Sequence, residues 1–354
     1  MGYSLEILNT IRNNASNEYA ERIPEATQNN IATIGQSFQT YTVLYNEFCE
    51  ALINKIGRTI LEQKMFKNKL ARFKQGGVVS PHDVEEIFIE MAKAEGSYDK
   101  DGKNPLGRRQ NPDVKAIYHR QNRQDYYAIS IGDIDFMRVF RSEATLDSFI
   151  KGMINSVYSA DAYDEWLAMK KLITTYKGKN AEGQDASYFD YEVTIISDEF
   201  IPMGDGIVEL GGMAAKSFVE TLKKAVYDVT FASKQYNVAG VNTWSDIENL
   251  VLFVHKDVVA HVDVHLLASA FNSSHVDLKV VPEIVVMDDF GDMTDTYAIL
   301  ADKDWLRVYD TLIHMEPQRN AQGLFTNYFF HHHQILSTST FKNAVRFKGT
   351  VMNG

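Results

Sequence analysis

Residues 145–178 read TLDSFIKGMINSVYSADAYDEWLAMKKLITTYKG, and this stretch carries the strongest helical pattern in the chain. Its apolar residues recur three and four positions apart, which places them on one face of an α-helix. A polar step at Ser159-Ala160-Asp161 separates two apolar runs, and Lys177-Gly178 is a stop signal. The pattern predicts one long helix, or two abutting helices, within residues 145–176. The apolar positions are Leu146, Phe149, Ile150, Met153, Ile154, Val157 and Tyr158, then Tyr163, Trp166, Met169, Ile173 and Tyr176.

Downstream of this helix, helical and extended patterns are mixed. A second amphipathic helix is predicted at 215–229, and Asp263 is placed to cap a third one. The continuous apolar run at 250–254 is typical of a buried strand. Further strand candidates lie at 188–196, 280–287, 297–301, 324–336 and 341–347.

Upstream of the helix the chain is poor in core material. Residues 1–48 are rich in Asn, Gln, Thr and Ser, and apolar positions such as Ile23, Ile31 and Phe38 are too sparse for an independent core. From Leu52 to Ile131 the sequence becomes basic and rich in turn residues. We expect an arm that lies on another body, such as a neighbouring subunit, followed by a long projection.

Charge is distributed unevenly along the chain. The formal charge is −11, but residues 51–123 hold 15 Lys or Arg against 9 Asp or Glu, a net +6 that leaves −17 elsewhere. The acidic total argues against a protein that coats nucleic-acid phosphates. Opposite charges in two parts of one chain suit contacts between copies, and the alternative is a solvated basic loop. The candidate contact residues are Lys64, Lys67, Lys69, Arg72, Lys74, Arg108, Arg109, Arg120 and Arg123.

The histidines form the most conspicuous candidate for chemistry, in the string His331-His332-His333. On an extended strand only His331 and His333 share a side, so a zinc site would need a third ligand from elsewhere. His261 and His265 have the spacing of a zincin helix, but the glutamate of that motif is missing. We predict structural or surface histidines and no metal site. The alternative is a metal-dependent hydrolase that uses His331, His333 and a distant acid.

The remaining signatures of catalysis are absent from the sequence. Carboxylate pairs such as Asp288-Asp289 indicate turns and caps, because catalytic acids need two different environments across a substrate. Phosphate-binding and dinucleotide-binding glycine loops and a nucleophile elbow are missing. Cys49, the single cysteine, is expected to be a buried apolar residue of a protein from a reducing cytoplasm. With no expected signal peptide or membrane span, the sequence predicts a soluble, non-enzymatic protein without cofactors.

Eight stretches, in the same order along the chain, resemble the major head proteins of picovirus-type short-tailed bacteriophages. None is a catalytic motif, and their collinearity from about residue 9 to 347 carries the resemblance. They lie at 9–13, 23–30, 111–115, 119–124, 164–172, 302–310, 319–324 and 341–345. The most specific stretches contain Lys303, Asp304, Trp305, Tyr309, Asp310, Asn320 and Gly323.

The resemblance implies the tailed-phage major capsid fold of the Hong Kong 97 type, an α+β fold. It implies a structural subunit that forms the pentamers and hexamers of an icosahedral or prolate head around double-stranded DNA. The expected partners are other copies, a scaffolding protein, a portal protein and DNA bound without sequence specificity, and no membrane. The virion head would be assembled in the host bacterial cytoplasm. The implied parts are an N-terminal arm at 1–50, an extended loop with flanking strands at 52–131, a peripheral domain at 132–209 with a spine helix at 145–176, an axial domain at 210–320, and a return through the peripheral domain at 321–354.

Three further expectations accompany the resemblance. Some family members carry an additional immunoglobulin-like C-terminal domain, for which we expect no room before Gly354. The rival within the same fold is a nanocompartment shell protein that encloses enzymes. The rival outside it is a tail-associated or chaperone-like structural protein that forms no closed assembly.

Overall fold

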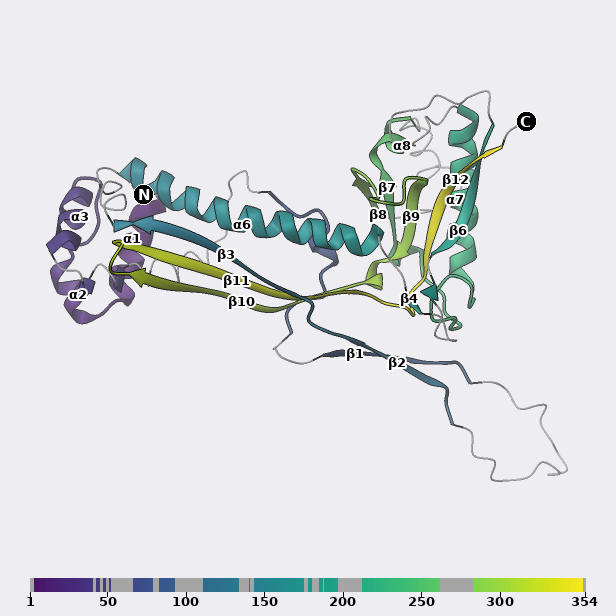
Figure 1. The fold of residues 1–354 in the computed structure, drawn as a ribbon, viewed down its shortest axis with the longest axis horizontal. Helices are drawn as coiled ribbons and strands as arrows, with labels where there is room; N and C mark the ends of the chain where they lie inside the picture. The colour runs from purple at the N-terminus through teal and green to yellow at the C-terminus, as the bar shows by residue number, and fades with distance from the viewer. Residues whose placement is uncertain are drawn as a thin grey trace.

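The computed structural model is an elongated molecule in which one long helix joins two ends (Figure 1). No helix among the described residues is long and apolar enough to cross a membrane. The structure describes residues 3–40, 43–44, 47–48, 51, 66–78, 83–92, 111–133, 140, 143–174, 178–179, 185–186, 188–196, 212–261 and 283–352.

The joining element is α6 (Glu143–Thr174), one continuous helix of 32 residues. The predicted long helix is therefore confirmed. The inward face of its second half differs from the expected stripe, because Tyr163 is 45% exposed and packs beside Phe66 and Trp166. The buried positions recur four residues apart instead, at Asp161, Glu165, Met169 and Ile173. An apolar pattern alone does not reveal inward-facing carboxylates, since these depend on partners from other elements.

A three-stranded antiparallel sheet lies along α6, with β11 in its centre. Its strands are β3 (Arg123–Gly132), β10 (Leu306–Asn320) and β11 (Phe325–Thr338). The strand expected at 324–336 is β11. We did not predict β10, because Pro317 and several charged residues in its exposed half hide the extended pattern.

A five-stranded mixed sheet forms one end of the molecule and carries the apolar core. α7 (Gly212–Thr230) packs on one face, and the end of α6 packs on the other. Every residue of β7 and β9 is buried, as expected of strands covered on both sides. The strands and the helix expected in the second half are confirmed, while the helix after Asp263 lies outside the described residues. The strand order is β6 (Phe189–Ile196), β12 (Ala344–Met352), β9 (Thr296–Asp302), β7 (Leu250–His255) and β8 (Glu283–Met287).

Short elements complete the described fold. They are α8 (Lys256–His261), the strand pair β4 (Gly178–Lys179) and β5 (Asp185–Ala186), and 3₁₀ turns at 71–73, 247–249 and 303–305.

The N-terminal segment forms a helical cluster at the opposite end of α6 (Figure 1). It consists of α1 (Tyr3–Asn14), α2 (Asn17–Arg22) and α3 (Ile31–Thr40). Its buried side chains form one cluster with Ile131 and Tyr328 of the three-stranded sheet. We expected apolar positions too sparse for an independent core, and the core that forms here is shared with the sheet of the same chain. The segment contributes more buried residues than expected, because α1 adds a buried face that its many polar residues obscure. That face comprises Leu5, Ile7, Leu8 and Ile11.

The basic segment 52–131 divides into pieces with different surroundings. β1 (Val84–Ile89) and β2 (Val114–His119) form an antiparallel hairpin that projects away from the body (Figure 1). Residues 66–78, by contrast, pack beside α6 and place Phe73 in the apolar core. β3 is one of the two edge strands of the three-stranded sheet. The projection therefore includes only part of the segment in which we expected it.

Candidate functional site

A buried ionic network lies between α6 and the three-stranded sheet. Asp161 and Glu165 are one helical turn apart on α6, and both side chains face the strands. An inward-facing acid in a protein core is costly unless it has hydrogen-bonded partners of opposite charge. The network consists of Lys74, Arg123, Asp161, Glu165, Asp310, His332 and Gln334.

His332 lies between two carboxylates. Its Nδ1 is 2.8 Å from Asp161 and its Nε2 is 3.1 Å from Oδ1 of Asp310, while the residue is 2% exposed. A neutral imidazole can donate only one hydrogen bond, so this arrangement favours the imidazolium form. Burial alone would lower the pKa of His332, but the two carboxylates outweigh burial and raise it.

Lys74 supplies the second buried cation. Its Nζ lies 2.6 Å from Oε1 of Glu165 and 2.8 Å from Oδ2 of Asp310. The side-chain amide of Gln334 donates to the same two carboxylates, at 2.6 and 2.7 Å. Burial would raise the pKa of Asp310, but hydrogen bonds from His332, Lys74 and Gln334 hold it well below its ordinary value.

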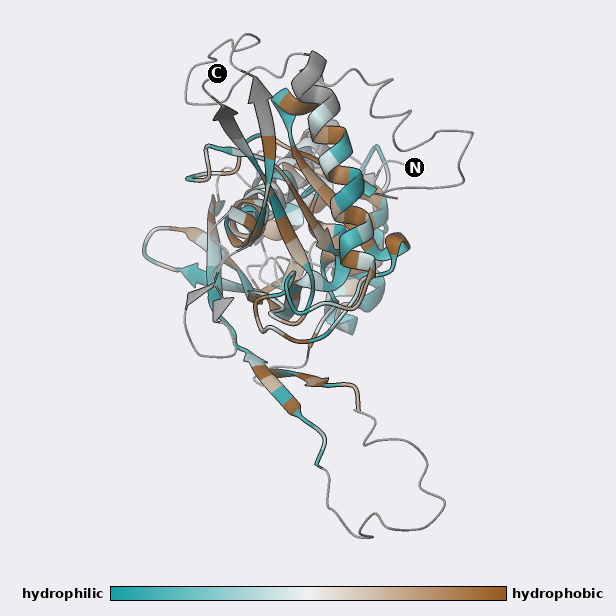
Figure 2. Ribbon diagram, turned by 90° about the vertical axis from the view of Figure 1, so that its right-hand side faces the viewer, coloured by the Kyte–Doolittle hydropathy of each residue, from teal (hydrophilic) through white to brown (hydrophobic). Residues whose placement is uncertain are grey.

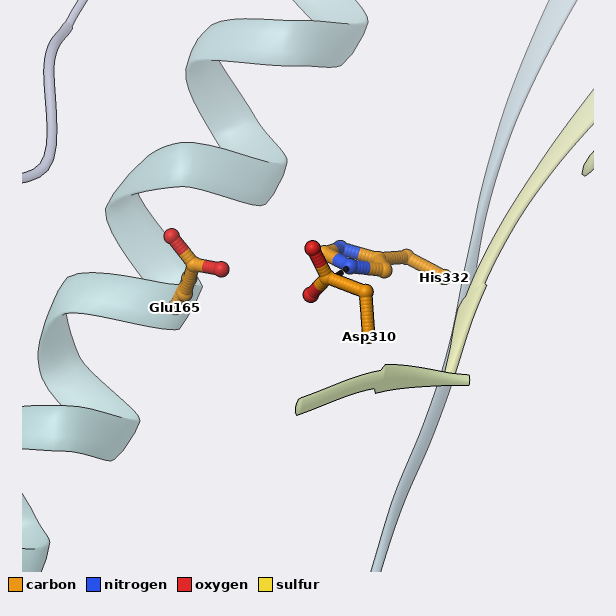
Figure 3. A group of neighbouring side chains, drawn as sticks. All are labelled: Glu165, Asp310 and His332. Carbon is orange, nitrogen blue, oxygen red and sulfur yellow. Dashed lines mark hydrogen bonds and ion pairs between the residues drawn. The ribbon is translucent and has the colours of Figure 1, made fainter. Parts of the chain in front are cut away.

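Glu165, Asp310 and His332 also form a group with metal-ligand chemistry. Figure 3 shows Glu165 on α6 pointing toward Asp310 and His332 on the strands, and the ligand atoms lie within 4.8 Å of one another. The ammonium group of Lys74 already contacts both carboxylates, and both nitrogens of His332 already face acids. The protein itself supplies the positive charge that a metal ion would bring. This group is therefore better explained as part of a structural ionic network than as a metal centre.

Arg123 connects β3 to the same network. Its guanidinium contacts Asp161 at 2.9 Å and Asp125 at 2.6 Å, and it also donates to Gln334. Arg123 is 6% exposed, and the side chain of Lys74 is 19% exposed. These two candidate contact residues therefore satisfy acids of their own subunit.

A second polar cluster, the hairpin anchor, holds the base of the β1–β2 hairpin. Glu86 of β1 accepts hydrogen bonds from Arg307 of β10 at 2.6 Å and from Ser339 at 2.9 Å. The same carboxylate lies 3.1 Å from His119 of β2, whose other ring nitrogen meets Ser337 at 2.7 Å. Burial alone would raise the pKa of Glu86. The hydrogen bonds that its carboxylate makes with His119 and Arg307 outweigh burial, and the pKa is lowered. The anchor thus ties both strands of the hairpin to the sheet.

The other candidate contact residues are more open to solvent. Lys67 and Lys69 are exposed, and Arg72 pairs with Glu283 while its side chain is 50% exposed. Arg120 is 77% exposed and pairs with Asp83 within the hairpin. Lys64, Arg108 and Arg109 lie outside the described residues, as does Cys49.

The stretch 302–310 lies at the junction of the two sheets. Trp305 is fully buried in the apolar core, and Asp310 belongs to the ionic network. Lys303 donates to the carbonyl of Glu248, and the backbone N–H of Asp304 donates to the side chain of Asp302, which caps the turn. Tyr309 is half-buried on β10. The second stretch forms the β10–β11 turn, in which the side chain of Asn320 accepts from the nitrogen of Gly323.

The remaining histidines and acids have structural surroundings. His255 is buried at the end of β7, and burial lowers its pKa. Asp288 and Asp289 both pair with Lys170 of α6. His261 ends α8, and His265 lies outside the described residues. Sequence patterns singled out Lys74, Arg123, Asp161, Asp310 and His332 separately, but not Glu165 or Gln334, and they did not predict that these side chains converge. The one available signal was the pair of acids spaced four residues apart inside an apolar stripe.

Comparisons with known proteins identify the family and the fold. A family model described as Phi29-like phage major capsid protein matches residues 8–348. The major capsid protein of Bacillus phage B103 is 33% identical over 347 residues, which covers 97% of this chain and 72% of that protein. The major capsid protein of Streptococcus phage Cp-1 is 29% identical and is aligned over 96% of this chain and 93% of its own length.

Solved structures show the same fold at low sequence identity. The capsid structure of Staphylococcus phage Andhra superimposes with a TM-score of 0.61 and 11% identity, covering 83% of this chain and 87% of that chain. The mature capsid of bacteriophage PhiM1 gives a TM-score of 0.53 and 10% identity, with 83% and 91% covered. The nanocompartment and hydrolase alternatives are not favoured by these similarities, and the head-protein resemblance is confirmed. This chain belongs to the Phi29-like phage major capsid proteins, structural and non-enzymatic components of the virion that have the Hong Kong 97 type fold and assemble into a capsid.

Proposed function

We propose that the subunit builds the head through pentamers and hexamers, with the β1–β2 hairpin reaching over a neighbouring copy. In this arrangement residues 210–320 form the axial domain around which the copies pack. Residues 1–50 are the arm, 52–131 the extended loop with flanking strands, 132–209 the peripheral domain, and 321–354 its returning part. One observation carries the proposal, namely the apolar outer face of a hairpin that projects from the body.

The two faces of the hairpin differ in their partners. The inner face packs Phe88 and Ile117 against a small cluster that contains Phe341. On the outer face Ile87 is 55% and Ile89 60% exposed. Figure 2 shows hydrophobic (brown) segments within the projecting hairpin. Exposed apolar side chains gathered on one surface usually mark a contact with another molecule. Since a lone two-stranded hairpin is only marginally stable in water, a neighbouring subunit on this face would stabilise it.

The hairpin anchor supports the proposal because it sets the direction of the projection before assembly. Glu86 and His119 belong to opposite strands of the hairpin, and both bind the end of the three-stranded sheet. A further ion pair joins Glu90, just after β1, to Lys234 near the end of α7. A preset direction lowers the entropy that the hairpin loses on binding a neighbour.

Charge gives the second contribution to contacts between copies. Lys67, Lys69 and Arg120 are exposed cations of the basic segment, and the remainder of the chain is strongly acidic. Complementary charges speed encounter and fix the register of docking, and many modest contacts in a closed shell add to a large avidity. Lys64, Arg108 and Arg109 are proposed for the same role from their place in the sequence.

The proposed partners are other copies of this chain, a scaffolding protein during assembly in the host bacterial cytoplasm, a portal protein, and packaged double-stranded DNA. We propose that the DNA is held without sequence-specific contacts. An acidic inner surface would repel phosphates and keep the packaged DNA mobile. A lysine-rich inner wall in an assembled head would contradict this last point.

The test is electron microscopy of the full-length protein expressed with and without a scaffolding partner. We expect capsomers or shells from the wild type and only folded, unassembled subunits from the double variant Ile87→Lys/Ile89→Lys. Glu85→Gln is the matched control, since Glu85 lies exposed on the same face. A monodisperse wild-type monomer under all conditions would overturn the proposal. Shells of normal size from the double lysine variant would show that assembly does not need the apolar face of the hairpin.

A further inference from the structure

The face of the three-stranded sheet that points away from the ionic network carries three histidines. His331 and His333 lie two residues apart on β11, so both side chains project on the side opposite to His332. In the antiparallel register, His314 of β10 is the direct partner of His331. His314 is 58% exposed at its side chain, and His331 and His333 are partly exposed.

The strand register places these histidines within reach of one ion. Directly opposed residues of an antiparallel pair have Cβ atoms about 5 Å apart, so the His314 and His331 side chains start side by side. The rings of His331 and His333 have centroids 6.4 Å apart and are nearly perpendicular. Two imidazoles on one tetrahedral zinc ion, at Zn–N distances of about 2 Å, have centroids about 5 Å apart. Rotation of the partly exposed side chains of His331 and His333 would bring their rings from 6.4 Å to this separation.

The surroundings favour a cation at this position. Oε2 of Glu316 lies 3.9 Å from Nε2 of His314, and the ring of Tyr126 lies against that of His331 at 5.9 Å. The direct partners of the two β11 histidines on the flanking strands are His314, Leu312, Tyr126 and Gln124, none of which is Lys or Arg. Imidazole ligands select zinc, copper or nickel over magnesium and calcium.

We propose that His314, His331 and His333 bind one divalent transition-metal ion of the zinc class on the outward face of β10 and β11. Three protein ligands leave a fourth position, which water or a group from a neighbouring copy can take. The site is separate from the ionic network, because His332 and its two carboxylates lie on the opposite side of β11. The proposal does not depend on assembly, so its failure would leave the head function unaffected.

The test is calorimetric titration of the purified, full-length soluble protein with Zn²⁺, checked by elemental analysis after dialysis. We expect one ion per chain in the wild type and binding weakened more than about tenfold by His314→Asn, His331→Asn or His333→Asn. The control is Gln124→Ala, which changes a neighbouring exposed side chain of the same face without removing an imidazole.

Two results would overturn the proposal. The first is less than one zinc ion per wild-type chain in the titration. The second is wild-type affinity in the double variant His314→Asn/His331→Asn, which would place the bound zinc elsewhere on the chain. Circular dichroism and thermal unfolding of each variant establish that a loss of zinc binding is not a loss of fold.

Discussion

The inward face of α6 meets two chemically opposite surroundings within a few turns. Met169 and Ile173 belong to the apolar core of the five-stranded sheet, together with Phe253. Glu165 and Asp161, one and two turns before Met169, face buried cations. Apolar packing is strong but non-directional, whereas charge-assisted hydrogen bonds act only in one geometry.

The apolar core and the ionic network make different contributions, one to the stability of the fold and the other to the position of α6. A buried ionic network contributes little net stability, because desolvation of the charges offsets their attraction. It nevertheless penalises any sliding or rotation of α6 that leaves a charge without its partner. We infer that the five-stranded sheet supplies most of the folding free energy, while the network fixes how the long helix lies on the three-stranded sheet. A shell subunit needs both, because small errors in its shape would accumulate around a closed assembly.

The largest expected effect concerns the apolar core of the five-stranded sheet. Phe253 is 1% exposed, and Phe253→Ala would leave a cavity between β7 and the end of α6. We expect a loss of about 3–5 kcal/mol in the free energy of unfolding, with little dependence on pH, since no charge is involved. Urea unfolding of wild type and variant at two pH values measures this loss in the free energy of unfolding. Phe231→Ala is the control, because Phe231 is 70% exposed. A loss that varied strongly with pH would contradict the distinction between the apolar core and the ionic network.

The next effect concerns the ionic network. Glu165→Leu removes the carboxylate that Lys74, Gln334 and Asn68 contact, and it leaves the lysine with Asp310 alone. We expect a loss of about 3 kcal/mol. Adding Lys74→Met should recover part of that loss, because the buried charge is then gone as well. The double-mutant cycle is measured by urea unfolding, and additive losses would mean that the two side chains act independently.

The parts of the fold that were predictable are those in which one segment carries its own signal. The buried strand at 250–254 and the helix α6 follow from runs of apolar residues in a single window. The ionic network could not be predicted in this way, since Lys74, Glu165 and His332 come from three distant segments. A carboxylate in a helical stripe suggests a solvent-facing position until its cation is known.

The hairpin anchor and the N-terminal cluster show the same limit. Glu86 stands among exposed acids and apolar residues of a turn-rich segment, and only the fold brings Arg307 against it. The apolar face of α1 was hidden by its polar neighbours, and it became a core only through contact with the sheet at Tyr328. Such contacts depend on strand register, which a single sequence specifies weakly where turns are long.

The smallest expected effect is a pH dependence of stability that the ionic network has and the apolar core lacks. Because the folded-state pKa of His332 is raised, its contribution is fully present below the unfolded value of about 6.5 and is lost as pH rises through the folded value. His332→Asn should therefore cost about 2 kcal/mol near pH 6 and less at higher pH. Unfolding free energies of wild type and variant, measured from pH 6 upward, give this difference directly.

The control for this prediction is His331→Asn on the other face of β11, since His331 has no place in the network. We expect its difference from the wild type to stay small across the same pH range. A His332→Asn deficit that stayed constant with pH would show that the imidazole acts through packing and not through its charge. That outcome would also weaken the assignment of geometry to the network, because Asp161 and Asp310 would then be held without the cation between them.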